Sequence, residues 1–287
     1  MYALSKHYRQ RRAFITGAGA GLGRALCEEL ARDGWTIGVA DINVAAIETL
    51  IPVIKTHGGK ALPYVLDIAD KGAYERAAAA FLQETAGIDV LINNAGIGDT
   101  YDFHLCSDAV WERIDRINRK GVIYGCQLFV PTMREQQSGT IVNVASVAAF
   151  CCPPGLTAYA TSKAGVTALS ECLYAELKYL GVRVSVVFPF MVNTNLFCYD
   201  HLSIRSRRSA QQLMKWFGVS PKTTAQVILR KAGRGRLYIP TSILAAWFFW
   251  FKRYAPQLFM TIQAILARRF DKKYVVLPGD KPRYIVP

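Results

Sequence analysis

The chain lacks the features that mark several classes of protein. Its seven cysteines include no Cys-x-x-Cys pair, and its four histidines show no metal-ligand spacing. We therefore expect neither a disulfide framework nor a bound metal, and a reducing, cytoplasmic environment suits this composition. Residues 1–12 are polar and basic without an apolar run, so no secretory signal is predicted.

Acidic residues are scarce in the last third of the chain. Residues 1–200 hold 18 Lys/Arg and 19 Asp/Glu, whereas residues 201–287 hold 17 Lys/Arg and only two acids. The 287 residues, 52% of them hydrophobic, are enough for one large core. We expect a single domain over 1–287, with a cofactor-binding and catalytic core at 12–194. Residues 195–287 would form a substrate lid and a basic, apolar extension.

Residues 13–188 alternate short apolar runs with longer helical stretches, which is the pattern of repeated βαβ units. The predicted strands are 13–16, 36–41, 61–67, 90–93, 140–145 and 183–188, with a further edge strand at 236–240. The predicted helices are 22–33, 44–56, 74–85, 109–133 and 158–180. Right-handed crossovers would place helices on both faces of the sheet. The sequence thus predicts an α/β, doubly wound parallel sheet, Rossmann-like, of about seven strands, with a helical C-terminal extension.

A glycine-rich turn joins the first predicted strand to the first predicted helix. The strict G-x-G-x-x-G spacing does not fit, but Thr-Gly-x-x-x-Gly-x-Gly does, with Gly17, Gly21, Leu22 and Gly23 in the turn. Glycines allow a backbone to turn tightly and approach a pyrophosphate, and the following helix points its amides at the phosphates. Such a turn can also be purely structural, so the pattern alone is weak.

Asp41 ends the second predicted strand, eighteen residues beyond Gly23. A carboxylate there would accept hydrogen bonds from the adenosine ribose and repel the extra phosphate of NADP, which favours NAD. The alternative role for Asp41 is to cap the next helix. The glycine turn at the right distance favours the ribose role.

Tyr159 and Lys163 lie four residues apart in a predicted helix, which places both on one face. An ammonium group near a phenol would lower the phenol pKa toward a useful acid/base range. Tyr/Lys pairs at this spacing are also common on exposed helices, so the pair alone does not predict a functional site. Ser146, however, lies thirteen residues upstream at the end of a predicted central strand, where ligands bind in such sheets. Together the three predict an acid/base site.

With these motifs the sequence resembles the shorter, single-domain branch of the short-chain dehydrogenase/reductase family over residues 12–195. The motifs occur in the family's order: residues 16–23, Asp67, Asn93-Asn94-Ala95-Gly96, Asn118, Ser146, Tyr159-x-x-x-Lys163 and residues 189–194. The resemblance implies that Ser146 orients the substrate oxygen and Tyr159 gives or takes the hydroxyl proton. It also implies that Lys163 holds the nicotinamide ribose and that Asn118 keeps a water linking Lys163 to solvent.

The resemblance assigns further cofactor contacts. Asp67 and Ile68 would contact the adenine, and small residues at Asn94, Ala95 and Gly96 would let the adenosine side lie close to backbone. Pro189 and Val192 would border the nicotinamide, and Thr194 would bond its carboxamide. The family usually has glycine after that proline, whereas this chain has Phe190. We expect this side chain to reshape the substrate entrance, and Cys151 and Cys152 to be small walls of the substrate pocket.

The C-terminal extension combines aromatic clusters with cations. The run at 243–251 holds nine apolar residues, far short of the ~20 that a spanning helix needs. A helix at 256–270 would carry an apolar stripe of Leu258, Phe259, Ile262, Ile265 and Leu266. The extension would lie on the inner face of an anionic membrane, form the lid and subunit contacts of a hydrophobic substrate pocket, or do both, since a lipid-like substrate favours both roles. Binding of nucleic acid is the third possible role of the extension. It is less favoured than the other two because the cations are interleaved with large apolar clusters.

These observations predict an NAD-dependent oxidoreductase that interconverts a secondary alcohol and a ketone, with Tyr159 as general acid/base. The aromatic extension favours a hydrophobic substrate, such as a lipid-, steroid- or isoprenoid-like alcohol. The alternative is a non-catalytic NAD-binding scaffold or sensor attached to a membrane. The resemblance also implies a homodimer or homotetramer built on the helices near 109–133 and 158–180.

Overall fold

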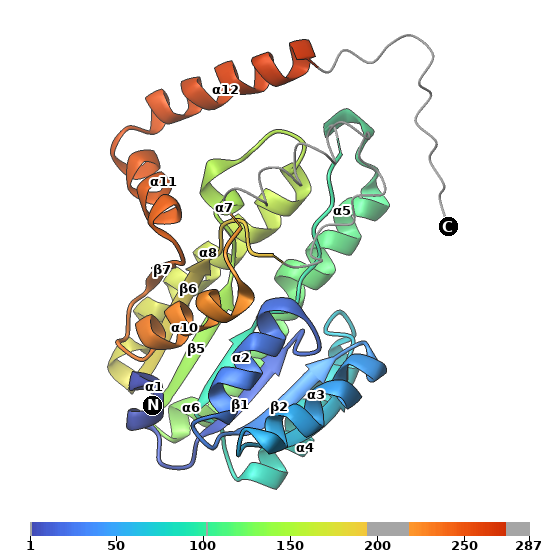
Figure 1. The fold of residues 1–287 in the computed structure, drawn as a ribbon, viewed down its shortest axis with the longest axis vertical. Helices are drawn as coiled ribbons and strands as arrows, with labels where there is room; N and C mark the ends of the chain where they lie inside the picture. The colour runs from blue at the N-terminus through green and yellow to red at the C-terminus, as the bar shows by residue number, and fades with distance from the viewer. Residues whose placement is uncertain (1, 102, 194–217, 274–287) are drawn as a thin grey trace.

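A computed structural model describes residues 2–101, 103–193 and 218–273. Within these ranges seven parallel strands form one twisted sheet in the order β3-β2-β1-β4-β5-β6-β7 (Figure 1). The strands are β1 (Arg12–Thr16), β2 (Thr36–Asp41), β3 (Lys60–Val65), β4 (Val90–Asn93), β5 (Gly139–Val144), β6 (Val182–Phe188) and β7 (Tyr238–Pro240). The predicted α/β, Rossmann-like sheet is confirmed.

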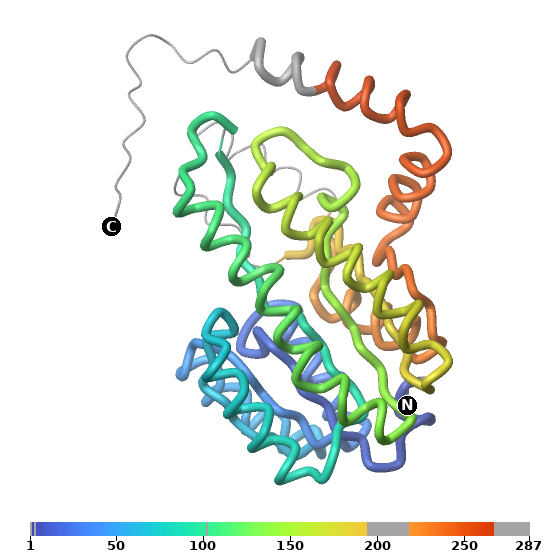
Figure 2. Tube along the Cα trace, turned by 180° about the vertical axis from the view of Figure 1, so that it is seen from behind, coloured from blue at the N-terminus to red at the C-terminus, as the bar shows by residue number. Residues whose placement is uncertain are grey.

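Helices cover both faces of the sheet and each face has its own apolar cluster. On one face lie α1 (Ala3–His7), α2 (Gly21–Ala31), α3 (Val44–Thr56) and α10 (Pro221–Ala232). The other face carries α4 (Lys71–Thr85), α6 (Gly121–Glu135) and α8 (Thr157–Leu177), which cross the view in Figure 2. The central strands are buried on both sides, which explains their continuous Val/Ile composition.

Several element boundaries differ from those that the sequence predicts. β3 ends at Val65, so Asp67 lies two residues beyond the strand that it was expected to end. β7 begins at Tyr238 rather than at residue 236. Three helices, α1, α7 (Ala148–Cys151) and α10, were not predicted. α1 and α7 are shorter than two turns, too short to show a helical period.

The predicted helical stretch at 109–133 is helical throughout but contains a π-helical turn that the sequence did not predict. α5 (Asp108–Asp115) leads into a π-helical turn at Arg116–Lys120, and α6 follows. The physical reason lies in the turn: the side chain of Asn118 points inward and bonds both backbone groups of Ile97. A widened turn accommodates such an insertion, and π-turns are frequent at functional sites.

The C-terminal extension forms α11 (Ile243–Tyr254) and α12 (Pro256–Lys273). The side chain of Ser242 accepts a hydrogen bond from the Ala245 amide and caps the start of α11. α11 lies beside α7, and α12 runs away from the sheet along the upper edge of Figure 1. No helix in the described ranges has both the length and the apolar content to cross a bilayer.

Candidate active site

The glycine turn between β1 and α2 is shaped for a ligand. Gly17 and Gly21 adopt φ of +62° and +51°, a left-handed conformation that favours glycine. A Cβ on Gly17 would lie 2.8 Å from the Ala95 Cα, and a Cβ on Gly23 would clash with the Gly17 carbonyl oxygen. α2 begins at Gly21, and its N-cap residue, Ala20, offers no side-chain hydrogen bond. The turn is a cradle with helix N-terminal amides, which suits a phosphate group.

Asp41 reaches this cradle from the end of β2. Its Oδ2 accepts a hydrogen bond of 2.8 Å from the amide of Gly19, and its Oδ1 accepts one of 2.9 Å from the amide of Asn43. The cap of α3 is Asn43, which accepts from the Ala46 amide. Asn43 rather than Asp41 therefore caps α3, so helix capping does not account for the carboxylate of Asp41.

Gly19 is a functional position that the motif treated as variable. A Cβ there would lie 3.0 Å from the Asp41 Oδ2 and 2.6 Å from the Ala46 Cβ. The absence of a side chain thus lets the loop approach the carboxylate. The signal was present in the sequence, because the turn holds one glycine more than the motif requires.

Thr16 and Asn94 tie the cradle to the neighbouring strand β4. The Asn94 side-chain amide donates to the carbonyl oxygens of Thr16 and Gly17 at 3.0 and 3.1 Å. The backbone amides of Asn94 and Ala95 both donate to the Thr16 Oγ1 at 3.1 Å. Asn94, expected to line the adenosine side of a cofactor, therefore holds the loop through its side chain.

Asp67 and Ile68 differ in what they offer to a ligand. Asp67 is exposed, and its Oδ1 accepts a hydrogen bond of 2.9 Å from the Ala69 amide. Ile68 is buried and packs against Gly121, where a Cβ would lie 2.6 Å from the Ile68 Cδ1. The adenine contact of both residues stays a prediction.

Ser146, Tyr159 and Lys163 meet at the carboxyl end of β5. Ser146 lies two residues beyond the strand, and its Oγ accepts a hydrogen bond of 3.1 Å from the Ala148 amide at the start of α7. Its hydroxyl also hydrogen-bonds the Tyr159 side chain. Tyr159 and Lys163 lie on α8, each 3% exposed, with the Lys163 Nζ 5.9 Å from the centre of the Tyr159 ring. The structure thus brings the three predicted residues together.

Burial sets the protonation of this pair. It raises the pKa of Tyr159 to about 12, and the hydrogen bond with Ser146 opposes that rise. It lowers the pKa of Lys163 to about 8. The expected lowering of the phenol pKa by the ammonium group is therefore not found, because desolvation of the buried phenol dominates its pKa. Tyr159 holds its proton firmly, and Lys163 titrates close to neutrality.

Asn118 is fully buried in the π-turn. Its Nδ2 donates to the Ile97 carbonyl at 2.9 Å and to the Ser162 Oγ at 3.2 Å, and its Oδ1 accepts from the Ile97 amide at 2.8 Å. Lys163 donates to the Val144 carbonyl at 2.9 Å. A Cβ on Gly96 would approach the Asn118 Oδ1 and the Lys163 Nζ at 3.0 and 3.2 Å. Gly96 therefore lies between them, and the predicted water stays a prediction.

The segment after β6 contacts both α7 and α11. The Pro189 carbonyl accepts a hydrogen bond of 3.1 Å from the Val147 amide, and Val192 forms a β-bridge with Val219. The Phe190 ring lies 5.6 Å from that of Phe248 in α11, at 66°. The side chain that departs from the family pattern thus packs against the C-terminal extension. Thr194 lies outside the described residues.

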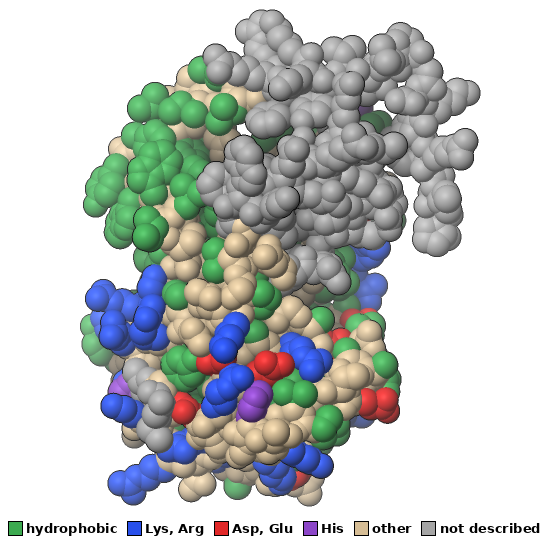
Figure 3. Space-filling view, in the orientation of Figure 1, with side chains coloured by type: hydrophobic (Ala, Val, Ile, Leu, Met, Phe, Trp, Pro, Cys, Tyr) green, Lys and Arg blue, Asp and Glu red, His purple; other side chains and the backbone are tan. Residues whose placement is uncertain are grey.

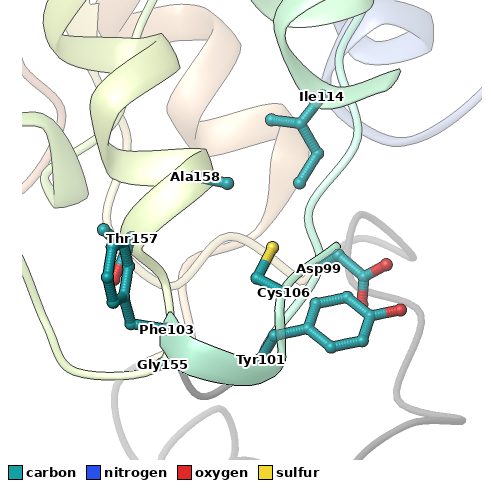
Figure 4. Close-up of a pocket in the computed structure, with 8 residues that line it drawn as sticks. All are labelled: Asp99, Tyr101, Phe103, Cys106, Ile114, Gly155, Thr157 and Ala158. Carbon is teal, nitrogen blue, oxygen red and sulfur yellow. The ribbon is translucent and has the colours of Figure 1, made fainter. Parts of the chain in front are cut away.

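A small pocket lies at the start of α8, and Ser146, Tyr159 and Lys163 are not among the residues that line it. Two of its walls, Thr157 and Ala158, directly precede the tyrosine on α8, and Figure 4 shows Cys106 facing Ala158 and Ile114 across it. Its lining residues are Asp99, Tyr101, Phe103, Cys106, Ile114, Gly155, Thr157 and Ala158. No motif marks residues 99–106, so sequence reasoning missed them. Their place beside α8 follows from the path of the chain after β4.

The role of Cys151 and Cys152 as walls of the substrate pocket stays a prediction. Cys151 ends α7 and its side chain is buried in a core cluster, where burial raises its pKa to about 12. Cys152 is exposed in a left-handed conformation with φ of +50°. The segment was expected to be a loop, but Ala148–Cys151 is a helical turn that directs Cys151 inward. Neither cysteine is among the residues that line the described pocket.

Comparison with known proteins places the chain in a family. Residues 11–200 match the family model described as short chain dehydrogenase. The 3-oxoacyl-[acyl-carrier-protein] reductase FabG of Thermotoga maritima is 33% identical over 232 residues, covering 80% of this chain and 93% of that protein. A crystal structure of a short chain dehydrogenase/reductase from Burkholderia phymatum in complex with NAD has a TM-score of 0.75 and 26% identity, covering 94% of this chain and 97% of the other.

The chain therefore belongs to the short-chain dehydrogenase/reductase family. The predicted resemblance is confirmed. A Mycobacterium tuberculosis protein named "Probable oxidoreductase EphD" is 38% identical over 183 residues, which cover 63% of this chain. The aligned part spans only 31% of that protein's length.

Proposed function

We propose that the protein is an oxidoreductase that interconverts a secondary alcohol and a ketone with NAD as hydride carrier. The observation that carries this proposal is the meeting of Ser146, Tyr159 and Lys163 at the same sheet edge as the glycine cradle. Carboxyl ends of parallel strands are where such sheets bind their ligands. A partly buried serine hydroxyl and a buried phenol beside a buried amine suit proton transfer to or from a substrate oxygen.

The residues of the cradle fit a dinucleotide. Side chains on Gly17, Gly19 or Gly23 would fill the space or displace the loop, and the start of α2 offers amides suited to phosphate. Gly17, Gly21 and Gly23 would hold the pyrophosphate, and Asp41 the adenosine ribose. When bound, the nicotinamide would supply or accept the hydride.

The chain's own residues manage the substrate oxygen. Ser146 and Tyr159, already hydrogen-bonded to each other, would both bond this oxygen and fix its carbon in place. In ketone reduction Tyr159 donates its proton, which its raised pKa keeps in place at neutral pH. In alcohol oxidation Tyr159 would first release its own proton to solvent, and the resulting phenolate oxygen would then accept the proton of the alcohol. The buried charge of Lys163 near the ring would favour the phenolate that remains after donation.

Asp41 is proposed to select NAD over NADP. Replacing Asp41 with Ser removes the carboxylate that would face the extra phosphate. At the effective dielectric of a protein surface, two charges about 4 Å apart repel by about 1–4 kcal/mol. We expect the ratio of kcat/KM for NAD to that for NADP to fall by about tenfold to a hundredfold. Steady-state kinetics with both cofactors, beside the nearby surface variant Glu48→Ser, measure this; an unchanged ratio contradicts the proposed role.

The substrate is proposed to be hydrophobic. The pocket at the start of α8 includes Phe103 and Ile114, and the Phe190 ring packs on the aromatic helix α11. The relative from Thermotoga maritima is named as a reductase of 3-oxoacyl groups, which are ketones on an acyl chain. These observations support a ketone or alcohol with a substantial apolar part.

A series of secondary alcohols of increasing chain length tests both the activity and the substrate class. With NAD as cofactor we expect kcat/KM to rise by about fourfold per added methylene until the pocket is filled, since each buried methylene contributes about 0.8 kcal/mol. The measurement is the initial rate of NADH formation across 2-alkanols and short diols. Faster turnover of short polar diols would exclude the hydrophobic substrate, and no turnover of any alcohol or ketone would exclude the activity.

The homodimer or homotetramer stays a prediction. The helices that would form it, α5 with α6 and α8, are placed side by side on one face of the sheet (Figure 2). Sedimentation equilibrium of the purified protein would determine its assembly.

A further inference from the structure

The outer faces of α11 and α12 are apolar. On α11 the exposed apolar side chains are Ile243, Trp247, Trp250 and Tyr254, at spacings of four, three and four residues. They form one stripe along the helix. On α12 the exposed apolar side chains are Leu258, Ile262, Ile265 and Leu266. Figure 3 shows this green area over the two helices. A surface helix normally turns polar residues outward, so the arrangement calls for a partner.

The inner faces of the same helices are already packed. The rings of Phe248 and Phe251 contact Phe259, which is buried. Of the stripe predicted on α12, only Phe259 therefore faces the core, and its other four members face outward. The exposed residues therefore form a second apolar face, separate from the side chains that pack in the core.

The two charged side chains of α11 are cationic, but Lys252 turns inward, with its ammonium group 5.7 Å from the centre of the buried Phe259 ring, whereas Arg253 is exposed. Residues 242–266 contain no Asp or Glu, and α11 ends in Lys252 and Arg253. If two copies met symmetrically through this face, Arg253 of each copy would find no acid among residues 242–266 of the other. An anionic surface would neutralise this charge, and exposed tryptophans suit the headgroup layer of a membrane.

We infer that the face formed by Ile243, Trp247, Trp250, Tyr254, Leu258, Ile262, Ile265 and Leu266, here called the α11–α12 face, docks on an anionic lipid membrane. The helices lie in the headgroup layer rather than span the bilayer. The Gln263 Nε2 of α12 donates to the Cys151 carbonyl of α7 at 3.3 Å, and the Phe249 ring of α11 lies 5.5 Å from that of Phe150. Because α7 directly follows Ser146, docking would bring the active-site region to the membrane, where a lipid-like substrate resides.

Vesicle sedimentation tests this inference without any measurement of turnover. We expect the protein to sediment with phosphatidylcholine vesicles that contain about 30% phosphatidylglycerol at low salt, and less with phosphatidylcholine alone. Binding should fall as NaCl rises from about 0.05 to about 0.5 M, because salt screens the cations. No sedimentation with the anionic vesicles at low salt would overturn the inference.

A matched pair of variants locates the contact. Ile243→Glu/Tyr254→Glu places two acids on the α11–α12 face, at side chains that are 91% and 80% exposed. Tyr179→Glu changes an 89% exposed tyrosine outside this face, in the turn after α8. We expect the double variant to bind anionic vesicles at least about tenfold more weakly, and Tyr179→Glu to bind like the parent. Circular dichroism checks that both are folded, and equal binding by the double variant would overturn the inference.

Tryptophan fluorescence provides a second readout if the acidic variant fails to fold. Lipids brominated in the acyl chain near the headgroup should quench Trp247 and Trp250. Replacing both with Phe should preserve sedimentation but remove most of that quenching. Sedimentation without quenching would mean that another basic surface holds the vesicles. Loss of self-association in Ile243→Glu/Tyr254→Glu, with unchanged vesicle binding, would mean that a second copy of the chain covers the face; either result overturns the inference.

Discussion

Replacing Tyr159 with Phe should lower kcat by about a thousandfold or more. The substitution removes one oxygen and keeps the ring, so the packing of this nearly fully buried side chain is preserved. What is lost is the group that gives or takes the proton, and such a group contributes about 10²- to 10⁴-fold to rate. The dissociation constant of NADH should change by less than about tenfold, because at most one hydrogen bond is removed. Single-turnover kinetics and fluorescence titration measure the two quantities separately.

A second tyrosine on the same helix serves as the control. Tyr174 lies further along α8, and its ring contacts the Lys178 ammonium group at 5.3 Å. Tyr174→Phe should leave kcat unchanged. If Tyr159→Phe retained the parent activity, Tyr159 would not be the acid/base and the proposed mechanism would be wrong. If it also lost NADH binding, the defect would be structural.

Replacing Lys163 with Met should abolish most activity and yet stabilise the unliganded protein at neutral pH. Burial lowers the pKa of Lys163 from 10.5 to about 8, which corresponds to about 3 kcal/mol at about 1.4 kcal/mol per pKa unit. Loss of the hydrogen bond to the Val144 carbonyl offsets about 1–2 kcal/mol of this. We expect a net gain of about 1–2 kcal/mol and a rise in Tm of roughly 2–6 °C. Differential scanning calorimetry measures it.

The pH dependence of that difference identifies its cause. Between pH 8 and 10.5 the folded parent protein has lost the Lys163 proton while the unfolded chain still binds one. The stability of the parent therefore rises with pH through this window. The Lys163→Met variant has no ionisable group at this position, so its stability does not rise in this way. Its gain in stability over the parent should therefore shrink from pH 7 to pH 10. Lys178→Met, which changes an exposed lysine, should show no advantage at either pH. A constant difference across this range would contradict burial of a charge as the cause.

The periodic parts of the fold could be predicted from sequence. β2, β4 and α3 have the predicted bounds, since each is a clear apolar strand or a helix with strong end signals. The π-helical turn at Arg116–Lys120 was not predictable, because it depends on hydrogen bonds between Asn118 and Ile97, residues that meet only after folding. α7 was missed because a helix of four residues shows no period.

Some features of the candidate active site could likewise be predicted from the sequence, and others could not. Ser146, Tyr159 and Lys163 were predictable because strand end and helical spacing place them together. The raised pKa of Tyr159 could not be predicted, because desolvation depends on how other side chains pack around the phenol. The spacing of Tyr159 and Lys163 in the sequence does not show that packing. The pocket residues Asp99 and Cys106 come from a segment without a motif. Sequence patterns thus identify groups fixed by regular backbone, whereas environment and irregular loops require the structure.

The hydrogen bonds of Thr16 and Asn94 have a consequence for cofactor binding. They join the turn after β1 to the segment after β4 before any ligand arrives. A cradle that is already rigid loses little conformational entropy on association, so more of the contact energy appears as affinity. The loops that hold the dinucleotide are thus preorganised, and any freedom that the protein needs for admitting its substrate must come from other parts of the chain.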